Sequence, residues 1–491
     1  MRKKEVNMNK CAQRYVLATA IAASLSVSLF STAALAENPV ISFSKQWTYS
    51  HAANPATPGQ TSEVPAFDRK TNTLWVAGVV GVDVLDAATG ALIEHIDISG
   101  YGAINSVAIH NGLAAFAIES PTRTNPGMVV FYDTKTRTLA EGINPIQVGA
   151  LPDMLTFTHD GSKLLVANEA TPITYGTRIG ASVPYVFAQP EGDPAGSVSI
   201  IDMATRDVVT VGFDGVPVSG DNVRINTGMN FEPEYITVNE DSTLAYVTLQ
   251  EANAMAVLDL TTNQFTGVIG LGAKDFSLPG NQIDPLNNGS VEFLSVPVKG
   301  LYMPDAIAAH QWCGNTYLVM ANEGDFREDD KDRSAASAFG AVAPLDKLRV
   351  SNTDSSPGNL YAVGARSFSI RNASGELVYD SGDILDKKAA ELGIYNDGRS
   401  RDKGVEPEGV ALLDIAGRTY AFISLERTSK SAIAIFDITN PTEVSFIDMI
   451  VTAGDVAPEG MAAYHYRGNF YLAIANEKSH TTTLYNLERK R

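Results

Sequence analysis

The chain has 491 residues, of which 44% are hydrophobic and 19% are charged, a composition typical of a folded globular protein rather than a disordered one. Its formal net charge of −19 argues against a general nucleic-acid-binding protein and against electrostatic docking on anionic lipid, because both need a basic surface. The same charge favours cations and neutral or basic molecules as partners.

The N-terminal segment has the parts of a secretory signal peptide. Basic residues that include Arg2 and Lys3 precede an apolar stretch of small residues, which ends in Ala34-Leu35-Ala36. Such an A-x-A-like ending is a cleavage site used in export. We therefore expect residues 1–36 to be removed and residues 37–491 to be periplasmic or secreted. No later apolar run approaches the ~20 residues of a membrane helix, so stable membrane insertion is not expected.

The rest of the chain is built from a repeated unit. Short apolar or alternating runs, bounded by turns of Gly, Asn and Asp, predict β-strands. The unit is clearest at residues 151–202 and recurs at 232–259. Most units predict four antiparallel strands, of which the third ends in Asp. Seven units start near Val64, Ile104, Leu151, Glu232, Pro304, Pro407 and Pro458.

Seven units of four strands predict an all-β protein folded as a seven-bladed β-propeller. The last unit supplies only three strands, and an orphan strand at residues 40–49 precedes the first unit. Pairing this strand with residues 458–486 would close the ring and remove open sheet edges. The alternative is two unrelated β-domains. The strand missing from the last unit and the extra strand before the first unit argue against it. The best helix candidate is residues 384–392. Insertions expected to form long loops lie at residues 171–195, 272–299, 326–358 and 392–404.

Acidic residues recur at two positions of the unit. One follows the proline that begins the first strand, and the other ends the second strand. The first two strands form a hairpin, so both positions should lie on one face of the ring, around its central channel. An acidic loop after Glu323 adds a further carboxylate, Asp325. The candidate metal ligands are Asp153, Glu169, Glu234, Glu251, Asp305, Glu323, Asp325, Glu408, Glu426, Glu459 and Glu477.

Converging carboxylates repel one another and raise each other's pKa unless cations intervene. Oxygen ligands suit Ca²⁺ or another hard divalent ion, so the pattern predicts such an ion as cofactor. The seven histidines include no close pair, which argues against a zinc site. The alternative is that the Pro-acid pairs are turns and that the strand-end glutamates cap neighbouring backbone N–H groups.

Three arginines are candidate catalytic residues. Arg327, Arg399 and Arg401 could hold an anionic substrate beside a metal ion, as phosphoryl chemistry requires. The alternative is that they neutralise the acids in salt bridges. The chain has no G-x-S-x-G elbow and no P-loop, which argues against two other families of catalytic site.

Four motifs carry a resemblance to a known family: residues 300–308 (GLYMPDAIA), 317–327 (YLVMANEGDFR), 394–410 (IYNDGRSRDKGVEPEGV) and 458–461 (PEGM). With them, nearly the whole chain after the signal peptide resembles the choice-of-anchor I family, which is similar to mesenchyme-specific cell-surface glycoproteins. The resemblance implies an exported propeller. Some bacterial relatives carry an alkaline phosphatase label, which implies an esterase as one activity.

Two hypotheses of function follow. The first is a metal-dependent phosphoesterase, similar to alkaline phosphatase, that acts on a small phosphorylated substrate. The second is a non-catalytic Ca²⁺-binding or adhesive module that associates with a component of the cell envelope. A monomer is expected in both cases.

Overall fold

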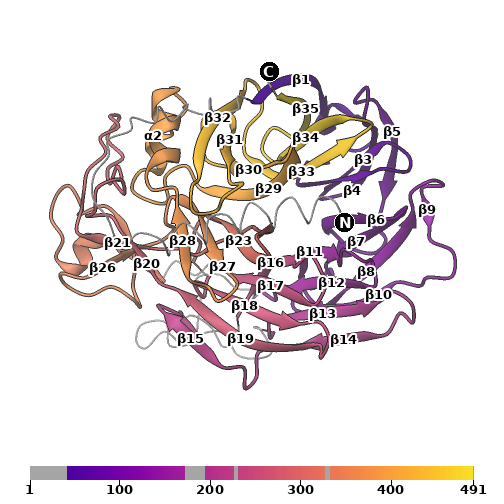
Figure 1. The fold of residues 1–491 in the computed structure, drawn as a ribbon, viewed down its shortest axis with the longest axis horizontal. Helices are drawn as coiled ribbons and strands as arrows, with labels where there is room; N and C mark the ends of the chain where they lie inside the picture. Colours follow the sequence, from indigo (N-terminus) through magenta and orange to yellow (C-terminus); the bar gives the residue numbers. More distant parts are fainter. Residues whose placement is uncertain (1–40, 172–193, 226–230, 327–331, 490–491) are drawn as a thin grey trace, which may run out of the picture.

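The computed structural model describes residues 41–171, 194–225, 231–326 and 332–489 (Figure 1). The predicted signal peptide, residues 1–36, lies outside these ranges. The described residues form an all-β structure with a single α-helix, α2 (Ile384–Glu391). This helix lies where the sequence predicts one. Within the described ranges, no helix has the length and apolar character needed to cross a membrane.

Seven sheets share one plan, in which four antiparallel strands lie side by side in chain order. In the fifth sheet an insertion separates the second strand from the third, and in the seventh the N-terminal strand takes the fourth place. The first contains β2 (Val64–Asp68), β3 (Thr73–Gly78), β4 (Gly81–Asp86) and β5 (Leu92–Asp97). The second contains β6 (Ile104–His110), β7 (Leu113–Ile118), β8 (Pro126–Asp133), β9 (Thr138–Leu139) and β10 (Ile146–Ala150). The third contains β11 (Pro152–Phe157), β12 (Lys163–Asn168), β13 (Ser197–Asp202) and β14 (Val208–Val211).

The remaining four sheets follow in chain order. The fourth contains β16 (Pro233–Val238), β17 (Leu244–Leu249), β18 (Ala254–Asp259) and β19 (Gln264–Leu271), with β15 (Val218–Asp221) parallel to β19. The fifth contains β22 (Ile307–Trp312), β23 (Asn315–Asn322), β27 (Ser367–Asn372) and β28 (Leu377–Asp380). The sixth contains β29 (Pro407–Ile415), β30 (Arg418–Leu425), β31 (Ser431–Asp437) and β32 (Ser445–Thr452). The seventh contains β33 (Pro458–Tyr466), β34 (Asn469–Asn476), β35 (Thr481–Arg489) and β1 (Ile41–Ser50).

The aspartate that ends the third strand shapes the turn to the fourth. The Asp86 carboxylate accepts hydrogen bonds from the backbone N–H groups of Ala88 and Thr89. Asp202 accepts them in the same way from Ala204 and Thr205. A side chain that bonds the backbone two and three residues ahead fixes a tight turn, which explains why Asp recurs at this place in the repeat.

The first strands of the seven sheets meet around a common centre (Figure 1). In chain order, each of β2, β6, β11, β16, β22, β29 and β33 contacts the next, and β33 contacts β2. The hairpins that begin at these strands therefore all bring their starting ends to the same central region. This arrangement positions the candidate site.

The first and last strands of the described chain are joined, as predicted for the orphan strand. β1 pairs antiparallel with β35, from Ile41 opposite Arg489 to Ser50 opposite Thr481. The seventh sheet thus takes its inner three strands from the C-terminal end and its outer strand from the N-terminal end. Such a pairing covers the edge that β35 would otherwise expose.

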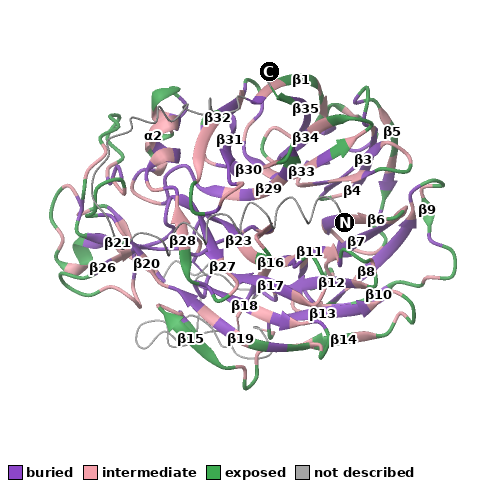
Figure 2. Cartoon of the chain, in the orientation of Figure 1, coloured by how far each residue is buried: buried purple, intermediate pink, exposed green. Residues whose placement is uncertain are grey.

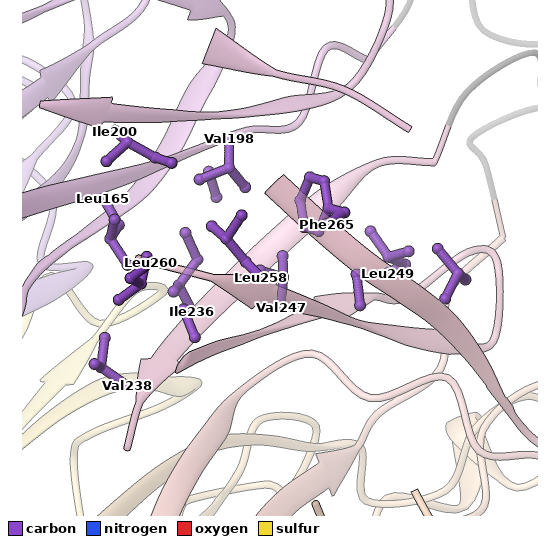
Figure 3. Packing of buried hydrophobic residues seen from close by; sticks show 14 of the residues in the cluster. Leu165, Val198, Ile200, Ile236, Val238, Val247, Leu249, Leu258, Leu260 and Phe265 are labelled. Carbon is purple, nitrogen blue, oxygen red and sulfur yellow. The ribbon is translucent and has the colours of Figure 1, made fainter. Parts of the chain in front are cut away.

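The cores lie between neighbouring sheets rather than within one. One cluster joins Leu165 and Val198 of the third sheet to Ile236 and Val247 of the fourth (Figure 3). Middle strands such as β12 and β17 are almost wholly buried, whereas the outer strands β14 and β15 are largely exposed (Figure 2). Burial of both faces explains the continuous apolar runs of the middle strands.

Two insertions that the sequence predicts as loops instead build an eighth sheet beside the ring. It contains β20 (Ala273–Asp275), β21 (Val298–Leu301), β24 (Arg333–Ala335), β25 (Arg349–Ser351) and β26 (Leu360–Ala362). The short helix η3 (Ala336–Phe339) packs into a small core of its own beneath this sheet. Two further 3-10 turns are η1 (His51–Ala53) and η4 (Asp397–Arg399).

Candidate functional site

The two acidic positions of the repeat lie side by side, as predicted. In the third sheet, Pro152 at the start of β11 lies opposite Asn168 at the end of β12. Pro458 lies opposite Asn476 in the seventh sheet in the same manner. The acid that follows the proline and the glutamate that follows the second strand therefore share one end of each hairpin, on the central face of the ring.

A repeated backbone irregularity directs the post-proline acid toward the centre. The residue before the proline has a positive φ in four repeats: 44° at Leu151, 44° at Met303, 54° at Glu406 and 59° at Ala457. This conformation is uncommon for a residue with a side chain and is further disfavoured before proline.

The register then shifts immediately after the proline. The shift lies between Pro152 and Leu155, and an equivalent shift follows Pro233, Pro407 and Pro458. A β-bulge of this kind reorients the side chains at the point where it occurs. Repeated strain of one form in one place is typical of a functional site.

These acids meet in one cavity of about 200 Å³. The cavity is lined by carboxylates from five sheets together with neutral groups that include Gln250, Tyr235 and Asn105. The lining carboxylates are Asp153, Glu234, Asp305, Glu323, Glu408 and Glu459. All six are among the metal ligands that the sequence predicts.

Three of the lining carboxylates are placed to share one ion. Oxygens of Asp305, Glu323 and Glu408 all lie within 4.8 Å of one another. Ca²⁺ binds oxygens at ~2.3–2.6 Å, so oxygens up to about 5 Å apart can ligate a single ion. The Glu408 Oε2 atom is buried and has no hydrogen-bond partner among the described residues. A divalent cation would therefore fit this donor set and would satisfy an otherwise unpaired carboxylate oxygen.

The electrostatics of the cavity also favour a cation. Burial and the adjacent Glu169 carboxylate raise the pKa of Asp153 to about 8. Burial raises the pKa of Glu408 well above its ordinary value, and Glu426 and Glu323 raise it further. The pKa values of Glu234, Asp305 and Glu459 are raised by burial and by neighbouring carboxylates in the same way. A bound cation would reverse these effects because it stabilises the ionised forms.

A second acidic group, beside the cavity, is already paired with basic side chains of the protein. It consists of Glu323, Glu406 and Glu426, whose oxygens also approach within 4.8 Å of one another. The buried Lys403 Nζ lies 2.6 Å from Glu323 Oε1 and 3.1 Å from Glu406 Oε2. Arg399 Nε lies 2.5 Å from Glu406 Oε1, and Arg427 Nη1 lies 2.5 Å from Glu426 Oε1. Protein side chains thus neutralise this group, which leaves the first trio as the better metal site.

The other predicted ligands lie around the cavity rather than along its lining. Glu169 accepts a hydrogen bond from Thr171, and Asp325 lies 3.7 Å from Lys403 Nζ. Glu251 is 9% exposed, and no residue in the described part of the chain forms a hydrogen bond with its buried Oε2 atom. Glu477 is half-buried and contributes to the raised pKa of Glu459. These residues add negative charge near the cavity, although they do not line it.

The predicted catalytic arginines do not form one constellation in the described residues. Arg327 lies outside those residues. Arg399 is held by Glu406, as in the salt-bridge alternative. The Arg401 backbone carbonyl accepts a hydrogen bond from Arg349 N, and the buried Arg401 Nε atom has no hydrogen-bond partner within the described ranges. Their role toward an anionic substrate stays a prediction.

Several residues of the site are absent from the sequence-based predictions. Glu406 and Lys403 build the neutralised group, and Gln250 donates through Nε2 to Glu323 Oε2 at 2.9 Å. Glu63, whose pKa burial raises to about 7, lies near Glu459 and Glu477. One signal was available for Glu406, because the run Glu406-Pro407-Glu408 places acids on both sides of the proline.

Comparisons with known proteins agree with the architecture. Residues 63–441 match the choice-of-anchor I domain. No curated protein matches the sequence. Among solved structures, a chain of the "Crystal Structure of Mitotic Checkpoint Complex" is similar over 95% of this chain and 99% of its own length. Its sequence identity is 10% and its TM-score is 0.50, so the similarity concerns the fold alone.

Proposed function

Because the chain belongs to the choice-of-anchor I family, we propose that it is an exported, non-catalytic module of the cell envelope. We propose further that its scaffold is a seven-bladed β-propeller closed by the N-terminal strand. The cyclic contacts of the seven first strands and the pairing of β1 with β35 support this architecture. In this proposal the central cavity holds a divalent cation, with Ca²⁺ as the first candidate.

One observation carries the cation proposal. Asp305 and Glu323 come from the β22–β23 hairpin and Glu408 comes from the β29–β30 hairpin, and their oxygens converge within 4.8 Å in a cavity that contains further buried carboxylates. Desolvated like charges of this kind are unfavourable unless they are protonated or bound to a cation. Oxygen donors without histidine or cysteine select a hard ion. The ion would tie two neighbouring hairpins together and so stabilise the ring.

The geometry favours this module over the phosphoesterase hypothesis. Phosphoryl chemistry needs cationic groups free to bind the substrate beside the metal ion. Arg399 and Arg427 instead lie against Glu406 and Glu426, and Lys403 is buried between Glu323 and Glu406. We therefore expect no turnover in a screen of phosphate esters with Ca²⁺ present. Metal-dependent release of phosphate would contradict the non-catalytic part of the proposal.

Thermal unfolding tests the cation site directly. Binding to the folded chain adds about 2.7 kcal/mol at 100-fold excess of ion over Kd, so a chelator should lower the melting temperature and added Ca²⁺ should restore it. Glu408→Gln removes one ligand charge at nearly constant shape and should weaken the Ca²⁺ response. Glu141→Gln, at an exposed position, should leave the response unchanged. Identical melting curves with and without chelator, and no metal in the purified protein, would defeat the proposal.

A further inference from the structure

A second cavity, of about 440 Å³, lies at the other end of the inner strands that line the acidic cavity. β2 reaches from Val64 in the acidic cavity to Phe67 in the second cavity, and β33 reaches from Glu459 to Tyr464. Strands rise ~3.3 Å per residue, so the two cavities lie roughly 10 Å or more apart along the strands. The second cavity has a volume typical of small-molecule sites, which span ~300–1,000 Å³.

The second cavity presents basic side chains, whereas the acidic cavity presents carboxylates. Arg69 and Lys70 line it, on the turn after β2, and both are exposed. Arg69 Nη2 donates to the backbone carbonyl of His465 at 2.5 Å, and Lys70 Nζ donates to that of Asn111 at 2.5 Å. Among the described residues, neither cation forms a salt bridge with a carboxylate. The only acid in the lining, Asp68, is buried and already accepts bonds from the backbone N–H groups of Lys70 and Thr71.

Aromatic side chains form another part of the wall. Phe67 and Tyr464 line the cavity, and their rings stack with centroids 3.8 Å apart and planes inclined by 6°. Tyr464 is 8% exposed and also stacks on Tyr471, so it supports the wall from behind. The partly exposed Phe67 and Ile109 give the wall its apolar surface for a flat or saccharide ligand. The cavity therefore combines an aromatic wall with two cations that carry only neutral partners.

The present partners of the cations define what a ligand should contain. An anion would replace neutral carbonyl acceptors with charge-assisted hydrogen bonds, and Arg binds carboxylates in a bidentate manner. The exchange would release the His465 and Asn111 carbonyl oxygens as acceptors for hydroxyl donors. One ligand class offers a carboxylate, several hydroxyls and a ring with an apolar face. We infer that this cavity binds an acidic saccharide, a uronate unit of a glycan.

This inference goes beyond the proposed function and stands on different residues. Its test is a calorimetric titration of the full-length protein with trigalacturonate in the presence of EDTA. The chelator removes any Ca²⁺ that could bridge the uronate to the acidic cavity. We expect binding, and we expect Arg69→Gln/Lys70→Gln to weaken it by about tenfold or more, because each variant residue loses a charge-assisted bond.

Matched controls separate this effect from a general change of charge. Lys135→Gln/Lys347→Gln removes two exposed cations elsewhere and should bind trigalacturonate like the wild type. The methyl-esterified trisaccharide should bind much more weakly than the acid. Unfolding curves of both double variants should match that of the wild type, since the altered side chains are exposed.

Three results would overturn the inference. The first is no binding of trigalacturonate in EDTA. The second is equal weakening in the two double variants. The third is displacement of the oligomer by inorganic phosphate at the same concentration, which would indicate an anion site without saccharide recognition.

Discussion

Lys403 separates two overlapping groups of carboxylates: the neutralised group of Glu323, Glu406 and Glu426, and the proposed metal site of Asp305, Glu323 and Glu408. Its ammonium group is buried and bonds Glu323 and Glu406, and its pKa is raised well above the ordinary value because these carboxylates outweigh the cost of burial. Burial alone would raise the pKa of Glu406, but Lys403 and Arg399 hold it below its ordinary value. The side chain thus acts as an internal counter-ion on one side of Glu323. The opposite side, toward Asp305 and Glu408, has no such cation among the described residues.

Replacing this lysine should make the protein depend more strongly on added metal. Lys403→Gln leaves buried carboxylates without their partner, a change that costs about 3–5 kcal/mol in comparable buried pairs. We expect a large drop in melting temperature in EDTA and a partial recovery with Ca²⁺ that exceeds the wild-type response. Lys135→Gln is the exposed control. A Lys403→Gln variant as stable as the wild type in EDTA would show that the ion pairs are not needed.

The ligand carboxylates could be predicted from sequence, but their partners could not. Asp153, Glu234 and Glu459 follow a proline at the start of a repeated strand, so the repeat itself places them. Lys403 and Gln250 reach Glu323 across 80 and 73 residues of chain, and no repeat spacing relates them. Only the folded structure shows that the Lys403 ammonium group lies between Glu323 and Glu406.

At the scale of elements, β1 connects the two ends of the described chain. Along its length it pairs with β35, and Trp47 Nε1 donates to the Ala87 carbonyl at 3.1 Å, beyond the end of β4 in the first sheet. β1 therefore bridges the seventh and first sheets. The pairing was predictable because the repeats left one strand over and one strand missing. The eighth sheet was not, because its strands of three or four residues carry no repeat and little periodicity.

Removing β1 should expose β35 and loosen the ring. A chain that begins at residue 51 should melt at a markedly lower temperature than one that begins at residue 37, and it should aggregate more readily through the open edge. A synthetic peptide of residues 41–50 should restore part of the loss by adding the missing strand. A scrambled peptide should have no effect. An unchanged melting temperature after the deletion would rule out a stabilising role for the pairing.

A buried polar cluster holds the same junction from inside. Asp83 of β4 accepts from His51 Nδ1 at 2.7 Å and from His95 Nδ1 at 2.6 Å. His51 Nε2 lies 2.8 Å from Thr482 Oγ1 of β35, so the cluster links the first and seventh sheets. Burial opposes ionisation of Asp83, but the two histidine hydrogen bonds outweigh it and hold the pKa below its ordinary value.

Asp83→Asn should therefore destabilise the junction. Asparagine cannot accept from both histidines through two oxygens, so a buried group loses its partner, at a cost of about 1–3 kcal/mol. Because the folded-state pKa of Asp83 is depressed, its contribution is present above the unfolded-state pKa and is lost as the pH falls through the folded-state value. The difference between wild type and variant should shrink below about pH 4 in denaturant unfolding. The exposed Asp214→Asn control should show neither effect.

At the scale of the whole molecule, the ring brings carboxylates that are far apart in the sequence into one acidic cavity. Carboxylates that are up to 306 residues apart, from Asp153 to Glu459, line a single cavity. Their raised pKa values mean that the folded chain without metal retains protons that the unfolded chain releases. Stability of the metal-free protein should then depend on pH in the direction opposite to that of Asp83.

The sign of this dependence can be worked out from the pKa values. Burial and neighbouring acids raise the pKa of Asp153 to about 8, and burial raises that of Glu323 to about 7. With a raised folded-state pKa, the stabilising contribution is fully present below the unfolded-state pKa of about 4 and is lost as the pH rises through the folded-state value. In EDTA, the melting temperature should fall between about pH 5 and about pH 8. Saturating Ca²⁺ should flatten or reverse the fall, because the ion binds the ionised carboxylates and its affinity rises as they lose protons.

Glu408→Gln should show a shallower fall of the melting temperature in EDTA and a smaller Ca²⁺ effect, whereas Glu141→Gln should follow the wild type. A melting temperature in EDTA that rises across this range would mean that the cavity carboxylates are ionised without a metal ion.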